Sequence, residues 1–417
     1  MNTFKSLGLI DPLLKTVNEL KFEKPSEIQL KSIPSILQGK DVIAQSATGS
    51  GKTLAFGLGI VQNITSGHGI QAIVLTPTRE LAVQVGKVIK ELSKYRKLEL
   101  AVVYGGVGIG PQIKELHKAD VVVGTPGRTL DHLQRRTLDL SRISIVVLDE
   151  ADRMLDMGFV EDVQKIIAQC PKKRQTLLFS ATIAHEVERL AHRYMKHPQK
   201  VSAKVHIDMD KLEEVYYNVD NKIKISLLIH LLKKEKKSLV MVFCNTRKNA
   251  DLVANNLRPQ GVQAMAIHGG FTQAKRTKVL EAFHSQRINV LVCTDVAARG
   301  LDIQDVSHIY NYDLPNDSKE YIHRIGRTAR AGKEGKIINL LSQRDHDNFS
   351  RILQDHRKKM KLVETPKVEQ IRIRWEGSRM RRDTKPFFRG GSRGHRDYRS
   401  HRDSRSHRDS RSHRGHR

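Results

Sequence analysis

Short apolar runs rich in β-branched residues alternate along this chain with longer segments in which hydrophobic positions recur at helical spacing. Such alternation is typical of parallel sheets that are covered by helices. Each half of the chain is therefore expected to form an α/β domain of similar size. The runs predict strands at residues 41–45, 71–75, 100–104, 120–124, 144–148 and 175–179, and then at 214–219, 238–243, 262–267, 289–293, 307–311 and 335–341.

The stretch between the two halves, residues 197–211, has weak periodicity and is the candidate linker. We place the linker itself at residues 206–212. Residues 363–375 fit either a short additional strand or an extension that packs on the second domain, and the sequence does not decide between them. The predicted organisation is an N-terminal region (1–30), a first domain (31–205), the linker (206–212), a second domain (213–362), an extension (363–377) and a tail (378–417).

A polar or glycine-rich signature follows nearly every predicted strand. In open parallel sheets, ligands bind in the crevice beyond the C-terminal ends of the strands. The sequence therefore predicts one functional edge in each half, and the two edges could face each other. The signatures are SATGSGKT, TPTRE, YGG, GTPGR, DEAD and SAT in the first half, and FCNT, HGG and CTDVAARG in the second.

Positive charge dominates the chain, which holds 73 Lys+Arg against 45 Asp+Glu and has a formal net charge of +28 at pH 7. Residues 378–417 alone hold 14 against 4, and the first 377 residues hold 59 against 41. This balance favours a polyanionic partner, with nucleic acid ahead of an acidic membrane surface. The tail repeats a basic hexad (SHRDSR, SHRDSR, SHRGHR) and has few large apolar residues, so we expect it to be disordered.

Several classes of protein are disfavoured by the same sequence. No apolar run approaches the roughly 18 residues that a membrane-spanning helix needs. The first residues lack the charged start, apolar stretch and cleavage site of a signal peptide. The three cysteines, at positions 170, 244 and 293, have no pairing or metal-ligand spacing. We therefore expect a reduced, cytoplasmic protein.

The stretch SATGSGKT lies between a predicted strand and a predicted helix, which is the setting of a phosphate-binding loop. In such a loop, Lys52 reaches the β- and γ-phosphates and the hydroxyl of Thr53 holds Mg²⁺. Ser46 stands where the usual first glycine would be, which weakens the bare pattern, and a glycine-rich turn is the alternative. The predicted phosphate-binding residues are Ser46, Ala47, Thr48, Gly49, Ser50, Gly51, Lys52 and Thr53.

Three acidic residues come at the end of the apolar run at 145–148, within the stretch DEAD. Beside a phosphate loop, Asp149 would hold Mg²⁺, usually through water, and Glu150 would orient the attacking water. Standing alone, the stretch could equally be a solvated acidic turn. Its place after a phosphate loop and before SAT favours the metal-site interpretation.

Taken together, these stretches resemble the motifs of the DEAD-box RNA helicases, a family of superfamily 2. The resemblance covers residues 1–360, in the family's order and spacing. Two departures are mild, since Ser26 stands where threonine is common and Ala329 where glycine is frequent, and neither removes a functional group. The matching stretches are KFEKPSEIQ (21–29, a Q motif), PTREL (77–81), GG (105–106), TPGR (125–128), DEAD (149–152), SAT (180–182), VFCNT (242–246), TDVAARGLD (294–302) and HRIGRTARAG (323–332).

The resemblance implies two tandem RecA-like domains separated by a cleft, with ATP and Mg²⁺ as ligands. Three arginines in seven residues can also form an ordinary basic surface, but in this family Arg327 and Arg330 are arginine fingers. Phe22 and Gln29 would bind the adenine, and Asp302 the ribose. Ser180, Ala181, Thr182 and His323 would couple the ATP and RNA sites. The implied catalytic residues are Lys52, Asp149, Glu150, Arg327 and Arg330, with Thr53 and Asp149 as metal ligands.

The same resemblance implies a track for single-stranded RNA that reads no base sequence. The expected activity is RNA-stimulated ATP hydrolysis coupled to local, non-processive unwinding of short RNA duplexes, with remodelling of RNA–protein or ribosome-assembly complexes by a monomer. An ATP-timed RNA clamp and a DNA-directed helicase are the alternatives. The expected RNA-binding residues are Pro77, Thr78, Arg79, Gly105, Gly106, Thr125, Pro126, Gly127, Arg128, His268, Gly269, Gln273, Arg276, Thr294 and Arg299.

Overall fold

The structure is a computed structural model that describes residues 3–46, 49–203, 211–235, 238–298, 301, 303, 306–328, 334–355 and 360–373. No helix within these ranges is long and apolar enough to cross a membrane. The predicted tail (378–417) and most of the predicted linker lie outside the described residues. So do five predicted site residues, which are Ala47, Thr48, Arg299, Asp302 and Arg330.

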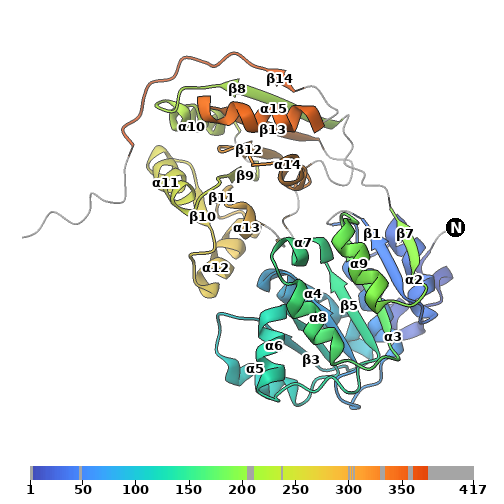
Figure 1. Cartoon of the computed structure of the whole chain (residues 1–417). Helices are drawn as coiled ribbons and strands as arrows, with labels where there is room; N and C mark the ends of the chain where they lie inside the picture. The colour runs from blue at the N-terminus through green and yellow to red at the C-terminus, as the bar shows by residue number, and fades with distance from the viewer. Residues whose placement is uncertain are drawn as a thin grey trace, which may run out of the picture. The chain divides into compact units, whose positions relative to one another are not determined.

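The first half of the chain forms a seven-stranded sheet in the order β3-β4-β2-β5-β6-β1-β7, and every pairing in it is parallel. Figure 1 shows helices on both sides of this sheet. The strands are β1 (Val42–Gln45), β2 (Ala72–Leu75), β3 (Leu100–Val103), β4 (Val121–Gly124), β5 (Ile145–Asp149), β6 (Gln175–Ser180) and β7 (Gln199–Ser202).

Both faces of this sheet are buried because successive side chains of a strand point to opposite faces. In β1, Val42 and Ala44 pack in the core cluster that α1 to α4 cover, whereas Ile43 packs in the cluster that α5 to α9 cover. The helices are α1 (Asp11–Glu19), α2 (Glu27–Leu37), α3 (Lys52–Asn63), α4 (Arg79–Leu92), α5 (Ile109–Leu116), α6 (Pro126–Gln134), α7 (Ala151–Asp156), α8 (Val160–Ala168) and α9 (His185–Tyr194), with 3₁₀ turns at Phe4–Leu7 and Ser93–Tyr95.

The second half repeats this topology strand for strand. Its sheet has the order β10-β11-β9-β12-β13-β8-β14, again with parallel pairings only, so β8 to β14 correspond to β1 to β7. The strands are β8 (Leu212–Asn218), β9 (Val240–Phe243), β10 (Ala264–Ile267), β11 (Val290–Cys293), β12 (His308–Asn311), β13 (Gly335–Leu341) and β14 (Lys361–Leu362).

The helices of the second half also divide between the two faces of the sheet. Residues of α10 and α11 belong to one core cluster, and residues of α12 to α15 belong to the other. The helices are α10 (Lys224–Lys234), α11 (Arg247–Leu257), α12 (Gln273–His284), α13 (Asp295–Ala298), α14 (Ser318–Ile325) and α15 (His346–Asp355), with 3₁₀ turns at Arg258–Gln260 and Gln343–Asp345.

The predicted extension (363–375) follows the second of the two arrangements left open, since its described residues, 363–373, pack on the second domain, and an added strand lies just before it. Lys361 and Leu362 form β14, which adds a parallel strand to β8. Beyond it, the backbone N–H of Ile371 donates to the Ser226 hydroxyl of α10 at 3.1 Å. Four side chains of this segment pack against the core cluster that includes α10, namely Val363, Val368, Ile371 and Ile373.

The structure confirms the expected fold class of two tandem α/β domains with parallel sheets. All twelve predicted strands are present, with ends that differ by at most two residues. Two strands were missed, β7 and β14, and both lie at a sheet edge. Part of the weakly periodic stretch at 197–211 is therefore the edge strand of the first sheet.

Candidate functional site

Lys52 is the first residue of α3, and it contacts the residue that follows β1. The ammonium group of Lys52 donates to the Ser46 carbonyl at 3.0 Å, and the side chain is buried. Gly49 and Gly51 have φ angles of +80° and +93°, a region that glycine enters without strain. A helix N-terminus with a buried lysine suits an anion such as a phosphate.

Helix α2 is tied to this loop through the Q motif. Gln29 accepts from the Ser26 backbone N–H at 2.9 Å and donates to the Gly51 carbonyl at 3.0 Å, while the Ser26 hydroxyl donates to the Ser50 carbonyl at 2.7 Å. A Cβ atom on Gly51 would lie 2.3 Å from the Gln29 amide nitrogen, so glycine is required there. Phe22 is 43% exposed, which leaves its ring open to stacking.

Asp149 ends β5 as a buried carboxylate. Burial raises its pKa to about 7, and Glu150 adds to this effect, while the positive charge of Lys52 opposes it. Glu150 has the left-handed φ of +53°. Its buried Oε2 makes no hydrogen bond within the described residues and lies 3.5 Å from Arg153 Nε. Asp149 and Glu150 therefore provide two buried carboxylates, and carboxylate oxygens are the ligands that a hard cation such as Mg²⁺ prefers.

The third acid of this stretch connects β5 to β6. Asp152 Oδ2 accepts from both the backbone N–H and the hydroxyl of Thr182, each at 2.9 Å. The Asp152 N–H donates to the Ser180 hydroxyl at 3.2 Å. Burial opposes ionisation, but the bonds from Ser180 and Thr182 prevail and hold the pKa of Asp152 below its usual range. DEAD and SAT, which are 28 to 30 residues apart, are therefore one hydrogen-bonded unit.

The RNA-binding residues predicted in the first domain gather at the C-terminal ends of β2, β3 and β4, which are neighbours in the sheet. Thr78 caps α4 by accepting from Leu81 N–H, and the guanidinium of Arg79 lies so close to Gly106 that a Cβ there would be 2.1 Å from it. The Arg128 guanidinium donates to the Val107 carbonyl at 3.0 Å. Thr125, Pro126 and Gly127 lead into or begin α6 on the same edge.

In the second domain, the equivalent edge carries His268, Gly269 and Thr294. His268 is buried, its Nε2 lies 2.9 Å from Asp251 Oδ2, and its Nδ1 accepts from Gly270 N–H at 3.2 Å. Both ring nitrogens of His268 therefore have protein partners. Thr294 ends the loop after β11 and precedes α13.

Gln273 and Arg276 were expected to bind RNA, and both contact one carboxylate of the first domain. Gln273 Nε2 donates to Glu80 Oε1 at 2.8 Å, and Arg276 Nε lies 2.9 Å from the same oxygen. Burial lowers the pKa of Arg276, and Glu80 opposes this. The motif TPTRE therefore takes part in two contacts. Arg79 lies against Gly106, and Glu80, the next residue, contacts Gln273 and Arg276.

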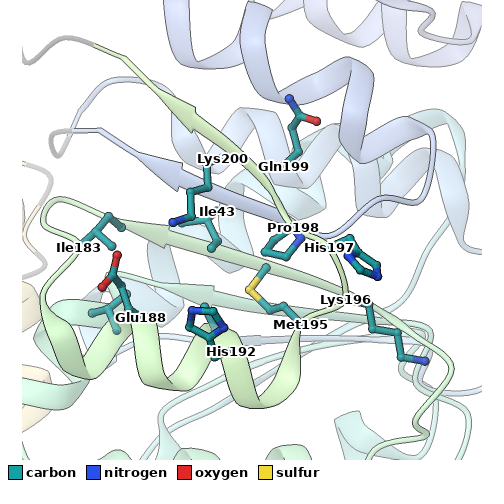
Figure 2. A pocket seen from close by; sticks show the side chains of 12 residues that line it. Ile43, Ile183, Glu188, His192, Met195, Lys196, His197, Pro198, Gln199 and Lys200 are labelled. Atoms are coloured by element: carbon teal, nitrogen blue, oxygen red, sulfur yellow. The ribbon is translucent and has the colours of Figure 1, made fainter.

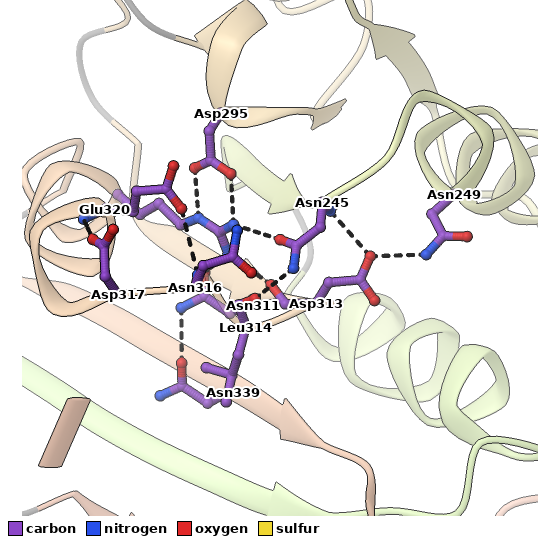
Figure 3. Close-up of polar contacts among 11 residues, drawn as sticks. Asn245, Asn249, Asp295, Asn311, Asp313, Leu314, Asn316, Asp317, Glu320 and Asn339 are labelled. Carbon is purple, nitrogen blue, oxygen red and sulfur yellow. Dashed lines mark hydrogen bonds and ion pairs between the residues drawn. The ribbon is translucent and has the colours of Figure 1, made fainter. Parts of the chain in front are cut away.

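The stretch HRIGRTAR contains a buried arginine to which the sequence assigned no role. Arg324 uses all five guanidinium hydrogens, and its partner residues are among those that Figure 3 labels. It donates to both carboxylate oxygens of Asp295 at 2.7 Å, and it also bonds Asn245, Asn311 and the Asp313 carbonyl at 2.9, 2.9 and 2.6 Å. It thereby fixes the loops that follow β9, β11 and β12. Arg327 is buried and donates to the Leu301 carbonyl.

The shared strand order reveals a second residue that the sequence argument missed. Thr246 caps α11 by accepting from Asn249 N–H at 3.1 Å, as Thr78 caps α4 after the corresponding strand. Arg247 then begins α11, and its guanidinium lies over Gly269, where a Cβ atom would be 3.4 Å away. The pair of TR dipeptides, one after each of two corresponding strands, is the signal that could have identified Arg247.

Comparisons with known proteins agree with this geometry. A family model described as DEAD/DEAH box helicase matches residues 26–190, and one described as helicase conserved C-terminal domain matches residues 223–332. A protein of Bacillus cereus named DEAD-box ATP-dependent RNA helicase CshA is 44% identical over 373 residues, which is 89% of this chain and 71% of the relative. The Bacillus subtilis protein of that name is 42% identical over 371 residues, covering 88% and 75%.

Solved structures with the same architecture include S. cerevisiae Dbp5 bound to RNA and ADP BeF3. That structure has a TM-score of 0.79 and 34% identity, and the match covers 88% of this chain and 96% of that one. A DEAD box protein from the hyperthermophile Methanococcus jannaschii gives a TM-score of 0.53 at 42% identity, with 87% and 99% covered. These matches confirm the expected tandem RecA-like fold.

Proposed function

The chain belongs to the DEAD-box ATP-dependent RNA helicases, and from this premise we propose that it opens short RNA duplexes locally and non-processively. We propose in addition that it remodels RNA–protein complexes in this way. The observation that carries the proposal is the hydrogen-bonded unit of Asp152 with Ser180 and Thr182. It joins the acidic loop after β5 to the segment that leads into α9. A movement of the loop that holds Asp149 and Glu150 would therefore also move SAT.

Within this proposal, the loop of residues 46–53 binds the phosphates of ATP, and Lys52 neutralises their charge. Thr53 and Asp149 would hold Mg²⁺, and the bound ion would offset the negative charge of the phosphates. Glu150 orients the attacking water, and its Oε2 has no competing hydrogen bond among the described residues. The ring of Phe22 stacks on the adenine and Gln29 bonds its edge, while Asp302 contacts the ribose.

Arg327 and Arg330 are the proposed arginine fingers, which supply positive charge to the γ-phosphate in the transition state. They belong to the second domain, whereas Lys52 and the carboxylates belong to the first. A complete ATP site therefore needs groups from both domains, with His323 among the residues that couple them. If RNA also binds both domains, ATP and RNA must raise each other's affinity by the same factor.

The proposed RNA track uses arginines, threonines and glycine backbones at the C-terminal edges of both sheets. Arg79 beside Gly106 and Arg247 beside Gly269 present guanidinium groups next to exposed backbone, which suits a sugar-phosphate chain. Such contacts carry no base information, so we propose binding without sequence preference. Arg299 and Thr294 would extend the same track.

A strand-displacement assay tests the proposal. The full chain should release the shorter strand of a duplex of about ten base pairs in the presence of ATP, and release should fall steeply as the duplex lengthens. Glu150→Gln should still bind ATP and RNA but lose turnover by a factor on the order of 10² to 10⁴, the range for removal of a catalytic base. A chain that holds RNA with an ATP analogue yet displaces no strand would be the clamp, and the unwinding proposal would fail.

A further inference from the structure

A groove of about 850 Å³ lies on the first domain between α9 and the edge strand β7 (Figure 2). Its floor is apolar, and Ile43, Val187 and Met195 are buried side chains that line it. Lys196 and Lys200 are exposed residues of its rim. Of the twelve residues that line the groove, Glu188 is the single carboxylate. The groove therefore combines an apolar base with a positively charged border.

The position of the groove follows from the sheet topology. β7 pairs with β1 alone among the described strands, so its other side is a sheet edge. Lys200 is paired with Ile43 in the register of β1 and β7 and so faces the same side of the sheet, the side on which α9 packs. No described helix follows β7 to cover this corner of the sheet.

The groove is distinct from the proposed RNA track. The predicted RNA-binding residues of the first domain follow β2, β3 and β4, whereas β1 and β7 lie at the opposite end of the strand order. The groove lining contains no Phe, Tyr or Trp, its two histidines (His192 and His197) are exposed residues, and its floor is aliphatic or thioether. An RNA ligand would leave this floor without a complementary surface.

We propose that this groove docks a segment of a partner protein that carries aliphatic side chains beside Asp or Glu residues. Aliphatic side chains match the floor, and carboxylates match Lys196 and Lys200 at the rim. The chain's own tail does not fit this description, because residues 378–417 hold 14 Lys+Arg against 4 Asp+Glu and would meet like charge. A protein segment with the opposite balance is the occupant that both the floor and the rim favour.

Site-specific photocrosslinking in cells can test this docking site in the full chain. A benzophenone amino acid replaces His192, an exposed α9 residue that lines the groove, and a second variant carries it instead of Lys173, an exposed residue outside the groove. The crosslinked segment is identified by mass spectrometry and synthesised as a peptide. Its affinity is then measured by fluorescence anisotropy for the wild-type chain, for Lys196→Glu/Lys200→Glu and for the matched control Lys172→Glu/Lys173→Glu.

The expected result is one protein crosslinked from position 192 but not from position 173, through a segment rich in aliphatic and acidic residues. The peptide should lose at least about tenfold in affinity for the groove double variant and stay within about twofold for the control. RNA-stimulated ATP hydrolysis of each variant serves as the check of folding. An RNA adduct, a crosslink to a second copy of the chain, no adduct, or equal affinities for both double variants would overturn the docking site.

Discussion

Replacing Arg324 by methionine should destabilise the second domain by about 3–5 kcal/mol, the usual cost of removing one partner of a buried ion pair. The side chain is only 1% exposed, and the change leaves four acceptor groups without their donor. Most of the cost comes from Asp295, whose carboxylate would keep its charge in a site built for a guanidinium. For a domain of this size, the loss corresponds to a melting temperature lower by roughly 6–20 °C.

Two further variants separate the contributions of hydrogen bonding and of charge to this loss of stability. Arg324→Lys keeps the charge but offers three donors in place of five and cannot bond Asp295 in the bidentate manner, so it should cost about 1–3 kcal/mol. Asp295→Asn combined with Arg324→Met removes the stranded charge and should recover part of the loss, on the order of 1–2 kcal/mol. Methionine is close in volume to the aliphatic part of arginine, so packing changes little.

Hydrogen–deuterium exchange of the full chain in increasing urea measures these effects domain by domain. Peptides from β9, β11 and β12 should exchange faster in Arg324→Met, whereas peptides from β1 to β6 should be unchanged and serve as the internal control. RNA-stimulated ATP hydrolysis should fall with them, because the same arginine holds the loops of Asn245 and Asp295. Wild-type exchange in the second domain, or a double variant no better than Arg324→Met, would refute the reasoning.

Three other predictions concern RNA contact, pH and the tail. Arg247→Ala should weaken RNA binding by about tenfold while its exposed neighbour Lys248→Ala changes it little, as fluorescence anisotropy would measure. Because burial raises the pKa of Asp149 to about 7 from 3.8, the folded protein binds the extra proton and loses stability as pH rises towards 7. In EDTA without nucleotide, the stability difference between Asp149→Asn and wild type should therefore grow by about 3 kcal/mol between pH 5 and pH 8, and equal pH profiles in urea unfolding would contradict it. Deleting residues 378–417 should reduce the salt dependence of RNA binding but leave ATP hydrolysis at saturating RNA nearly unchanged; an unaltered salt slope would exclude the tail as an RNA contact.

The fold was predictable largely because strands such as β2, β4 and β9 are buried on both faces and are therefore continuous apolar runs. β7 gave no such run, since in Gln199–Ser202 only Val201 is buried, and β14 has two exposed residues. The carboxylates and the phosphate loop were recognisable because their residue types and spacing are set by local geometry. The burial of Arg324 could not be predicted in this way, because its partners lie at the ends of three other strands. Arg327, in the same motif, has different contacts, so the motif alone does not show which arginine is held in this network.

The two sheets correspond strand for strand, and in each of them residues from separate sequence motifs come together. In both domains, a threonine caps the helix after the second strand, an arginine begins that helix, and a pair of glycines follows the third strand. Because those strands lie in corresponding positions, the arginine and the glycines meet in space although 22 to 27 residues separate them along the chain. A side chain in place of Gly106 would displace Arg79, with a Cβ only 2.1 Å from the guanidinium, whereas Gly269 leaves more room for Arg247 at 3.4 Å. Gly106→Ala should therefore weaken RNA binding more than Gly269→Ala, and the reverse order would show that the two edges do not hold RNA by the same arrangement.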